Sequence, residues 1–179
     1  HAAAGGVGLI ACQWARHLGA TVIGTVGTEE KAELARAMGC EHAIVYSREN
    51  FTERVREITG GEGVAVVYDS VGKTTFEGSL DCLRPLGMMV SFGNASGPVA
   101  PFDPGVLAAK GSLFLTRPTL MAYTAKDEDL AASAKELLDM VEAGHVKISV
   151  NQTYPLKDAA RAHADLEARQ TTGSTVLII

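Results

Sequence analysis

The chain has 179 residues, of which 46% are hydrophobic and 21% charged, and its formal net charge is −5. This length is enough for one domain with a buried core, and the composition is that of a globular protein. The negative charge gives no reason to expect nucleic acid or an anionic membrane as a partner, and no apolar run approaches a membrane span. Cys12, Cys40 and Cys82 form no C-x-x-C pair, so they indicate neither a zinc site nor a disulfide framework and fit the reducing cytoplasm.

A glycine-rich turn stands at the start of the chain. Gly5, Gly6 and Gly8 run into an amphipathic helical pattern over residues 9–18, and from Ala3 the spacing reads A-x-G-x-x-G. This is one substitution away from the G-x-G-x-x-G fingerprint of dinucleotide-binding folds. Gly5 would let the backbone approach a pyrophosphate, Gly8 would let the helix pack closely on a sheet, and the helix N-terminus would attract phosphates. The alternative is a tight turn before a buried helix.

A strand should precede this fingerprint, yet only His1 and two alanines stand there. We therefore expect the first strand of the sheet to be truncated. The sheet would then have a gap beside the strand of residues 21–26, unless another strand, for which residues 175–179 are the candidate, fills it.

The rest of the chain alternates between apolar runs and helical patterns. Thr28 is a candidate N-cap, Asn50 and Glu53 resemble a capping box, and Pro85 should stop a helix. Strands are expected at 21–26, 42–46, 64–68, 87–92, 112–116, 148–154 and 175–179, and helices at 9–18, 29–38, 51–59, 73–83, 127–143 and 156–169. The inward faces of three of these helices are predicted to consist of Val7, Ile10, Ala11, Trp14 and Leu18, then Phe76, Leu80 and Leu83, and finally Leu130, Ala134, Leu137, Leu138 and Val141.

This alternation predicts an α/β fold, a Rossmann-like doubly wound parallel sheet flanked by helices, in one domain over residues 1–179. Ligands of such folds bind beyond the C-terminal ends of the strands. Residues 93–105, rich in glycine and proline, interrupt the alternation and form either a functional loop or an inert surface loop.

The strand of residues 21–26 carries the signal for the cofactor. An NAD site places an acid at this strand end, but Val26 stands there, and Glu29 and Glu30 lie inside the next helix. Lys31 and Thr28 can instead offer an ammonium group and a hydroxyl to a 2′-phosphate. The pattern favours NADP over NAD, and the alternative is that Lys31 is an ordinary surface lysine.

Five segments together resemble one family. They read HAAAGGVGLIACQWA, GTVGTEEKAELA, VVYDSVG, MMVSFGNASGPV and GSLFLTRPTL. The chain is similar to the zinc-independent NADPH:quinone oxidoreductases, which include zeta-crystallin, in the medium-chain dehydrogenase/reductase superfamily. The likeness extends over all 179 residues but covers only the cofactor-binding half of that family, so the GroES-like N-terminal domain is expected to be absent.

The resemblance implies the positions of the NADP(H)-binding residues. Gly5, Gly6 and Val7 should lie along the pyrophosphate, Gly27, Thr28 and Lys31 around the 2′-phosphate, and Tyr46 against the same end. Ser70 and Val71 should approach the adenosine, Phe92, Gly93, Asn94, Arg117, Pro118 and Thr119 should line the nicotinamide side, and Arg169 should reach back to the cofactor.

The implied reaction is reduction of a quinone by NADPH, in which the cofactor carries the chemistry and the protein orients it. No nucleophile–base constellation and no metal-ligand spacing stands out, so no catalytic or metal-binding residue is predicted, and the cofactor half alone is not expected to turn over. The resemblance also implies a homodimer through the strand of residues 112–116. Two alternatives remain, an enal or enoyl-thioester reductase of the same superfamily and a non-catalytic, crystallin-like nucleotide-binding module.

Overall fold

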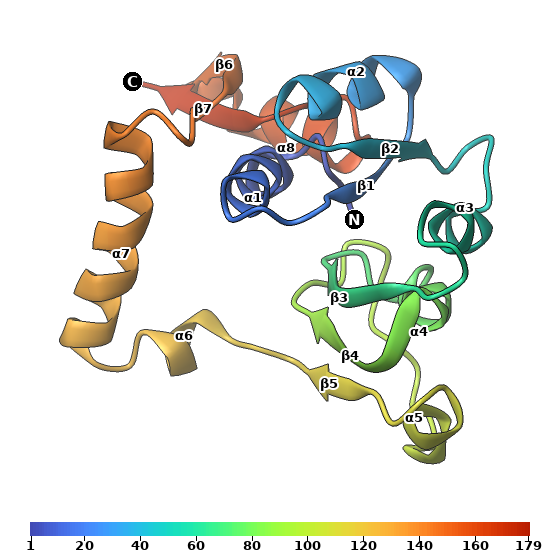
Figure 1. The fold of residues 1–179 in the computed structure, drawn as a ribbon. Coiled ribbons are helices and arrows are strands. Elements are labelled where there is room, and N and C mark those ends of the chain that lie inside the picture. The colour runs from blue at the N-terminus through green and yellow to red at the C-terminus, as the bar shows by residue number, and fades with distance from the viewer. The chain divides into compact units, whose positions relative to one another are not determined.

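The computed structural model describes residues 1–179 (Figure 1). Its helices are α1 (Gly6–His17), α2 (Glu29–Ala37), α3 (Phe51–Ile58), α4 (Phe76–Asp81), α5 (Gly105–Ala109), α6 (Leu120–Tyr123), α7 (Asp127–Glu142) and α8 (Ala159–Glu167), with a 3₁₀ turn at Leu156–Asp158. Its strands are β1 (Ile23–Val26), β2 (His42–Val45), β3 (Val64–Asp69), β4 (Leu83–Ser91), β5 (Phe114–Thr116), β6 (Val150–Pro155) and β7 (Ser174–Ile178). The predicted alternation of strands and helices is confirmed. None of the helices combines the length and apolar character that crossing a membrane requires.

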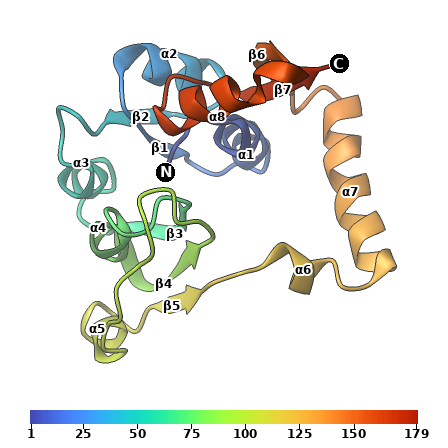
Figure 2. The same cartoon turned by 180° about the vertical axis from the view of Figure 1, so that it is seen from behind.

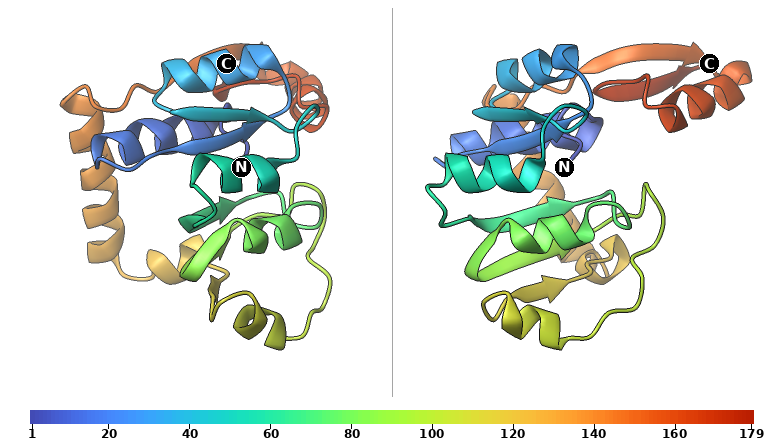
Figure 3. Two further views of the ribbon diagram at one scale, coloured as in Figure 1. Left: turned by 45° about the vertical axis from the view of Figure 1, so that its right-hand side comes forward. Right: turned by 90° about the vertical axis from the view of Figure 1, so that its right-hand side faces the viewer.

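The chain divides into two compact units, each of which is described by itself. Unit 1 comprises His1 and residues 48–134, and unit 2 comprises residues 2–47 and 135–179. Unit 1 holds the sheet β3–β4–β5, and unit 2 holds the pairs β1–β2 and β6–β7 (Figures 2 and 3). Every pair of neighbouring strands is parallel, as predicted for a Rossmann-type fold.

The sequence predicted a truncated first strand and a gap in the sheet, and the structure contains three separate ladders. Strand β1 pairs with β2, and the Thr25 carbonyl oxygen of β1 also accepts a hydrogen bond of 3.1 Å from the Ala3 amide. The candidate for filling a gap, residues 175–179, does not do so. It belongs to β7, which pairs with β6, and the adjoining Gly173 forms an isolated parallel bridge to Gly5.

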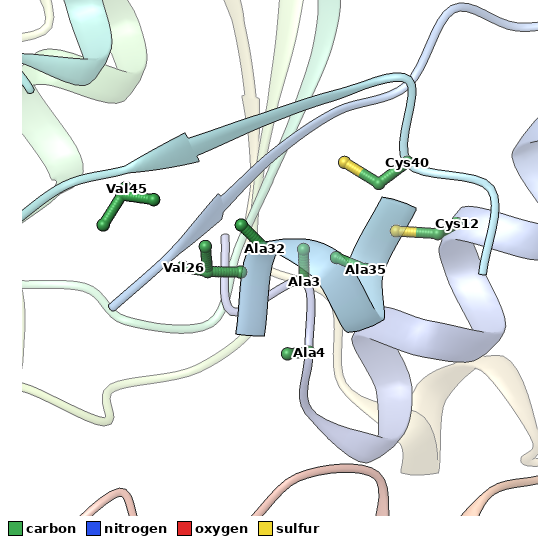
Figure 4. Packing of buried hydrophobic residues seen from close by; sticks show 8 residues of the cluster. All are labelled: Ala3, Ala4, Cys12, Val26, Ala32, Ala35, Cys40 and Val45. Atoms are coloured by element: carbon green, nitrogen blue, oxygen red, sulfur yellow. The ribbon is translucent and has the colours of Figure 1, made fainter. Parts of the chain in front are cut away.

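Small side chains dominate the core of unit 2 (Figure 4), which consists of Ala3, Ala4, Cys12, Val26, Ala32, Ala35, Cys40 and Val45. Such side chains let α1 and α2 approach the strands closely. Gly24 shows how tight the packing is, because a Cβ there would lie 2.6 Å from the Ala3 Cβ and 2.7 Å from the Cys40 Sγ. The Thr28 hydroxyl caps α2 by accepting from the Lys31 amide, as predicted.

Helix α1 turns a different face inward from the one predicted. The predicted apolar face includes Val7 and Leu18, which are 66% and 73% exposed, while Leu9 and Cys12 are buried. The reason lies in Gly8, since a Cβ there would be 2.3 Å from the Ala2 carbonyl oxygen. The helix packs through its glycine, which has no side chain and therefore adds nothing to the apolar pattern. The predicted role of Gly8 in close packing is confirmed.

The core of unit 1 lies beside β3 and β4. Phe76, Leu80 and Leu83 are buried, as predicted, together with Met89 and Leu113. Helix α4 is shorter than predicted, because β4 already starts at Leu83 and continues through Pro85, which does not end the helix. The ladder shifts register between the Val64–Leu83 and Val66–Met88 pairs, and this irregularity accommodates the chain around the proline.

The later elements depart from the prediction in three places. Helix α5 begins inside the segment 93–105 that was expected to be a loop, and the short helix α6 was not expected. Strand β5 is shorter than residues 112–116, since Ser112 has a φ of 56° in the turn before it. Helix α7 has the predicted extent, but its predicted inward face is wrong. None of its residues is buried, and Leu130 and Leu138 are 50% and 64% exposed.

Candidate nucleotide-binding site

The glycine turn of unit 2 presents an uncapped helix N-terminus. Gly5 is the N-cap of α1 in an extended conformation (φ −79°, ψ 172°), no side chain caps the helix, and its first turn contains no acid. Gly6 lies against the neighbouring chain, because a Cβ there would be 3.3 Å from both the Gly173 carbonyl oxygen and the Ser174 Oγ. Val7 projects into solvent. The backbone amides and the helix dipole are thus arranged as an anion site requires.

A second group of predicted residues gathers beyond β1 and β2, and we call Gly27, Thr28, Lys31, Tyr46 and Arg169 the phosphate cluster. The Lys31 Nζ donates to the Arg169 carbonyl oxygen at 2.5 Å, and the Arg169 Nη1 donates to the Tyr46 hydroxyl at 3.4 Å. A Cβ on Gly27 would lie 3.0 Å from the same hydroxyl. Arg169 adopts a φ of 59°, which turns the chain after α8 back toward this group. The sequence signals for all five residues converge on one place in unit 2.

The phosphate cluster has an excess of positive charge. Neither Lys31 nor Arg169 lies within salt-bridge distance of a carboxylate in this structure. The Glu29 carboxylate, an acid close to the position that an NAD site uses, pairs instead with the Arg36 guanidinium at 2.9 Å. Val26, at the position where an NAD site carries its acid, is 2% exposed and belongs to the core. The cluster is therefore suited to an anion, and nothing in it would repel a phosphate.

In unit 1 the turn after β3 is held by Asp69, a residue that the sequence reasoning missed. Its buried carboxylate accepts from the amides of Val71 (2.7 Å) and Gly72 (3.0 Å) and from the hydroxyls of Thr75 (2.7 Å) and Ser79 (2.9 Å). The available signal was a polar residue directly after an apolar strand, where Rossmann-type folds place functional turns.

The turns after β3 and β4 lie against each other. Ser70 accepts from the Ala95 amide at 3.1 Å, and Phe92 donates to the Asp69 carbonyl at 2.8 Å. A Cβ on Gly93 would come within 2.5 Å of the Ser70 carbonyl oxygen, so only glycine fits there. The structure thus brings together Ser70, Val71, Phe92, Gly93 and Asn94 in unit 1.

His1 belongs to the same network, although sequence reasoning assigned it no role. Its Nε2 lies 2.8 Å from the Ser79 Oγ and 4.0 Å from the Asp69 Oδ2, and its ring contacts Phe51 edge-on. A histidine at the start of the sequence has no pattern around it from which such a contact can be inferred.

The segment after β5 holds the remaining predicted residues. The Arg117 Nη1 donates to the Ser91 carbonyl oxygen at 2.8 Å, and Thr119 caps α6 by accepting from the Ala122 amide. Arg117 also borders a pocket of about 280 Å³, which we call the β4–β5 pocket and which is lined by Phe76, Ser91, Asn94, Pro98, Val99, Phe102, Leu115 and Arg117. Asn94 and Arg117 thus share this pocket, whereas Pro118 and Thr119 do not line it. Each unit therefore contains its own group of predicted residues.

Comparison with known proteins identifies the family of the chain. A family model described as zinc-binding dehydrogenase matches residues 6–143. The quinone oxidoreductase of Pseudomonas aeruginosa is 57% identical over 178 residues, which are 99% of this chain and 55% of that protein. A 2-haloacrylate reductase of a Burkholderia species is 56% identical over 182 residues, covering 99% of this chain and 54% of the relative.

A solved structure shows the same fold. The crystal structure of Escherichia coli quinone oxidoreductase complexed with NADPH superimposes with a TM-score of 0.95 at 54% identity, covering 99% of this chain and 56% of that one. The chain thus spans about 55% of the length of the curated relatives it matches. The resemblance to the quinone oxidoreductases inferred from the five sequence segments is confirmed by these relatives, and the chain belongs to the zinc-binding dehydrogenase family.

Proposed function

We propose that the chain binds NADPH and that the phosphate cluster of unit 2 holds the adenosine 2′-phosphate. The observation that carries this proposal is the convergence of Lys31 and Arg169, two cations without a carboxylate partner, in a chain whose net charge is −5. The Thr28 and Tyr46 hydroxyls add polar groups beside them. Charge-assisted hydrogen bonds of this kind are strong, and they distinguish a 2′-phosphate from a 2′-hydroxyl. The NADPH found in the Escherichia coli relative supports the same cofactor.

We assign the other predicted residues to the pyrophosphate, the adenosine and the nicotinamide of the same cofactor. The uncapped N-terminus of α1 suits the pyrophosphate, with Gly5, Gly6 and Val7 along it. In unit 1 we assign Ser70 and Val71 to the adenosine. The nicotinamide side is assigned to Phe92, Gly93, Asn94, Arg117, Pro118 and Thr119.

The proposed reaction is the NADPH-dependent reduction of a quinone. When bound, the cofactor supplies the hydride, and the residues of this chain bind and orient it. Because the chain corresponds to about 55% of its relatives, we propose that a GroES-like domain outside it completes the substrate site. We name no catalytic residue and no metal ligand in this chain.

A titration of NADPH and NADH, followed by cofactor fluorescence, tests the cofactor proposal. NADPH should bind more tightly than NADH, and Lys31→Ala should weaken NADPH binding about tenfold or more, since a charged hydrogen bond contributes roughly 1.5–3 kcal/mol. NADH binding should change little. The exposed Lys157 of unit 2, converted to alanine, is the matched control and should behave as the wild type. Equal affinity for both cofactors in the wild type would overturn the assignment.

A second candidate is reduction of an activated alkene, such as an enal or enoyl thioester. It is favoured by the 2-haloacrylate reductase, whose crystal structure superimposes with a TM-score of 0.90 at 56% identity. NADPH oxidation by the full-length protein in the presence of a quinone or of 2-chloroacrylate separates the two activities. Cofactor binding without turnover of any such acceptor would instead favour the third candidate, a non-catalytic module.

We also propose a homodimer and a cytoplasmic location. Strand β5 lies at an edge of its sheet, and its Phe114 is 56% exposed, so residues 112–116 can pair with the same strand of a second copy. The three cysteines are free thiols, as is usual in a reducing compartment. Light scattering of the full-length protein should give twice the monomer mass, and a monomer at tens of micromolar would contradict the dimer.

A further inference from the structure

The β4–β5 pocket of unit 1 has the character of a small-ligand site. Its volume of about 280 Å³ lies just below the range for ligand pockets, roughly 300–1,000 Å³, so its occupant is smaller than a typical drug. Five of its eight lining residues are apolar, and the rings of Phe76 and Phe102 lie with their centroids 5.0 Å apart and their planes inclined at 50°. Such a lining favours a flat aromatic or conjugated ligand.

One charged group borders this apolar surface. The Arg117 guanidinium donates to the Ser91 carbonyl oxygen, which fixes its orientation, and no carboxylate of the chain lies within salt-bridge distance of it. None of the eight lining residues is acidic. A guanidinium has five N–H donors in a planar fork and matches a carboxylate in two parallel hydrogen bonds. The neighbouring Asn94 amide is a further polar group at the same pocket.

We propose that the β4–β5 pocket binds a small aromatic carboxylate, whose ring lies against Phe102 and Val99 and whose carboxylate pairs with Arg117. The charge complementarity and the pocket volume carry this assignment. The pocket includes Asn94 and Arg117, which are assigned above to the nicotinamide side, so NADPH and the aromatic carboxylate should compete for it. The 2′-phosphate assignment is tested separately, because the phosphate cluster belongs to unit 2 and shares no residue with the pocket.

The test compares two probes that differ only in charge. 1-Naphthoate and the neutral 1-naphthalenemethanol are titrated into the protein without cofactor, and binding is followed by calorimetry. 1-Naphthoate should bind about tenfold or more tightly than the alcohol, as expected for one charged hydrogen-bonded pair. Arg117→Gln should remove this preference, and Phe102→Ala should weaken both probes. Arg84, an exposed arginine of β4 outside the pocket, is the matched control, and Arg84→Gln should bind as the wild type does.

Three results would overturn the proposal, namely no binding of 1-naphthoate at millimolar concentration, equal binding of the two probes by the wild type, or an unchanged preference in Arg117→Gln. The comparison of probes on the wild type needs no variant, so a misfolded variant would not leave the question open. NADPH titrated separately into the wild type and into Lys31→Ala reports on the cofactor proposal, because Lys31 lies outside the pocket, so that failure of one proposal is distinguished from failure of the other.

Discussion

At the scale of single residues, Asp69 shows how one buried side chain orders the turn after a strand. The carboxylate is 0% exposed and accepts four hydrogen bonds, two from backbone amides and two from hydroxyls. A carboxylate has about four acceptor sites, so these donors satisfy it fully. The burial that would otherwise destabilise a charge is therefore compensated, and the Ser70–Val71 turn has a defined position.

Replacing Asp69 with asparagine should destabilise the protein. The new amide group replaces an acceptor oxygen with two N–H donors beside four donors, of which the Val71 and Gly72 amides cannot accept, and a buried group left unpaired costs about 1–3 kcal/mol. The midpoint of urea denaturation should fall accordingly. Asp139→Asn is the control, since Asp139 forms an exposed pair with Lys135 and should contribute about 1 kcal/mol or less. Equal shifts in the two variants would contradict this role of Asp69.

Tyr154 provides a prediction about pH. Its hydroxyl donates to the Asp165 Oδ2 at 2.8 Å, and this bond to a carboxylate raises the pKa of Tyr154 above its ordinary value of 10. Because the folded-state pKa is the higher one, the contribution to stability is complete below pH 10 and is lost as the pH rises through the folded-state pKa. Tyrosinate absorbance near 295 nm should show one late-titrating group, which disappears in Tyr154→Phe. In Asp165→Asn it should titrate earlier, and an unchanged titration there would exclude Asp165 as the cause.

At the scale of elements, local signals were predicted correctly and packing directions were not. The caps at Thr28 and Asn50 follow from residues adjacent in sequence, and both side chains accept the expected amide hydrogen bonds. The inward face of α1 depends on Gly8 and on the backbone that it touches, which no pattern of apolar residues reports. The phosphate cluster was found through the family resemblance for Tyr46 and Arg169, since their contact joins residues 123 positions apart.

The packing of α1 can be tested at Gly8. Alanine is the better helix former by about 1 kcal/mol, so propensity alone predicts that Gly8→Ala stabilises the protein. The structure predicts the opposite, because the added Cβ would lie 2.3 Å from the Ala2 carbonyl oxygen and 2.7 Å from the Ala3 backbone. Overpacking of this kind costs roughly 1–3 kcal/mol or more. Thermal unfolding should show a lower midpoint than the wild type.

Gly6 provides the control for this prediction. It lies two positions earlier in the same turn, and a Cβ there would meet looser contacts, at 3.3 Å from the Gly173 carbonyl oxygen and the Ser174 Oγ. Gly6→Ala should therefore lower the unfolding midpoint less than Gly8→Ala does. If Gly8→Ala raised the midpoint, helix propensity rather than close packing would determine the requirement for glycine at this position.

At the scale of the whole molecule, the sequence predicted the class of the fold but not which strands share a ladder. Each strand and most helices follow from local periodicity, and the parallel pairing follows from their alternation. Strand pairing is a property of the whole chain, which local periodicity does not report. The same holds for α7, whose apolar residues predict an inward face although none of its residues is buried.

Because no residue of α7 is buried, we expect a protease to cut the chain first in this helix or directly beside it. Helices with few buried contacts open locally at little cost in free energy, and proteases cut what opens. Lys126 and Lys135, whose side chains are 71% and 72% exposed, should be the first sites at which trypsin cleaves this chain. Mass spectrometry of a short digest identifies them, and earlier cleavage at Arg16 or Arg56 would contradict the prediction.

The fragments should then remain together, because unit 2 is built from both ends of the chain. The Gln13 side chain donates to the Lys147 carbonyl oxygen and accepts from the Lys147 amide at 2.9 Å, and Gly173 donates to the Ala4 carbonyl oxygen at 2.9 Å. Residues 136–179 are thereby joined to residues 2–47 by contacts that cleavage in α7 leaves intact. After cleavage at Lys135 the C-terminal fragment should co-elute with the N-terminal one in size-exclusion chromatography and separate only in denaturant. A C-terminal fragment that elutes alone in native buffer would mean that these contacts do not hold unit 2 together without the connecting chain.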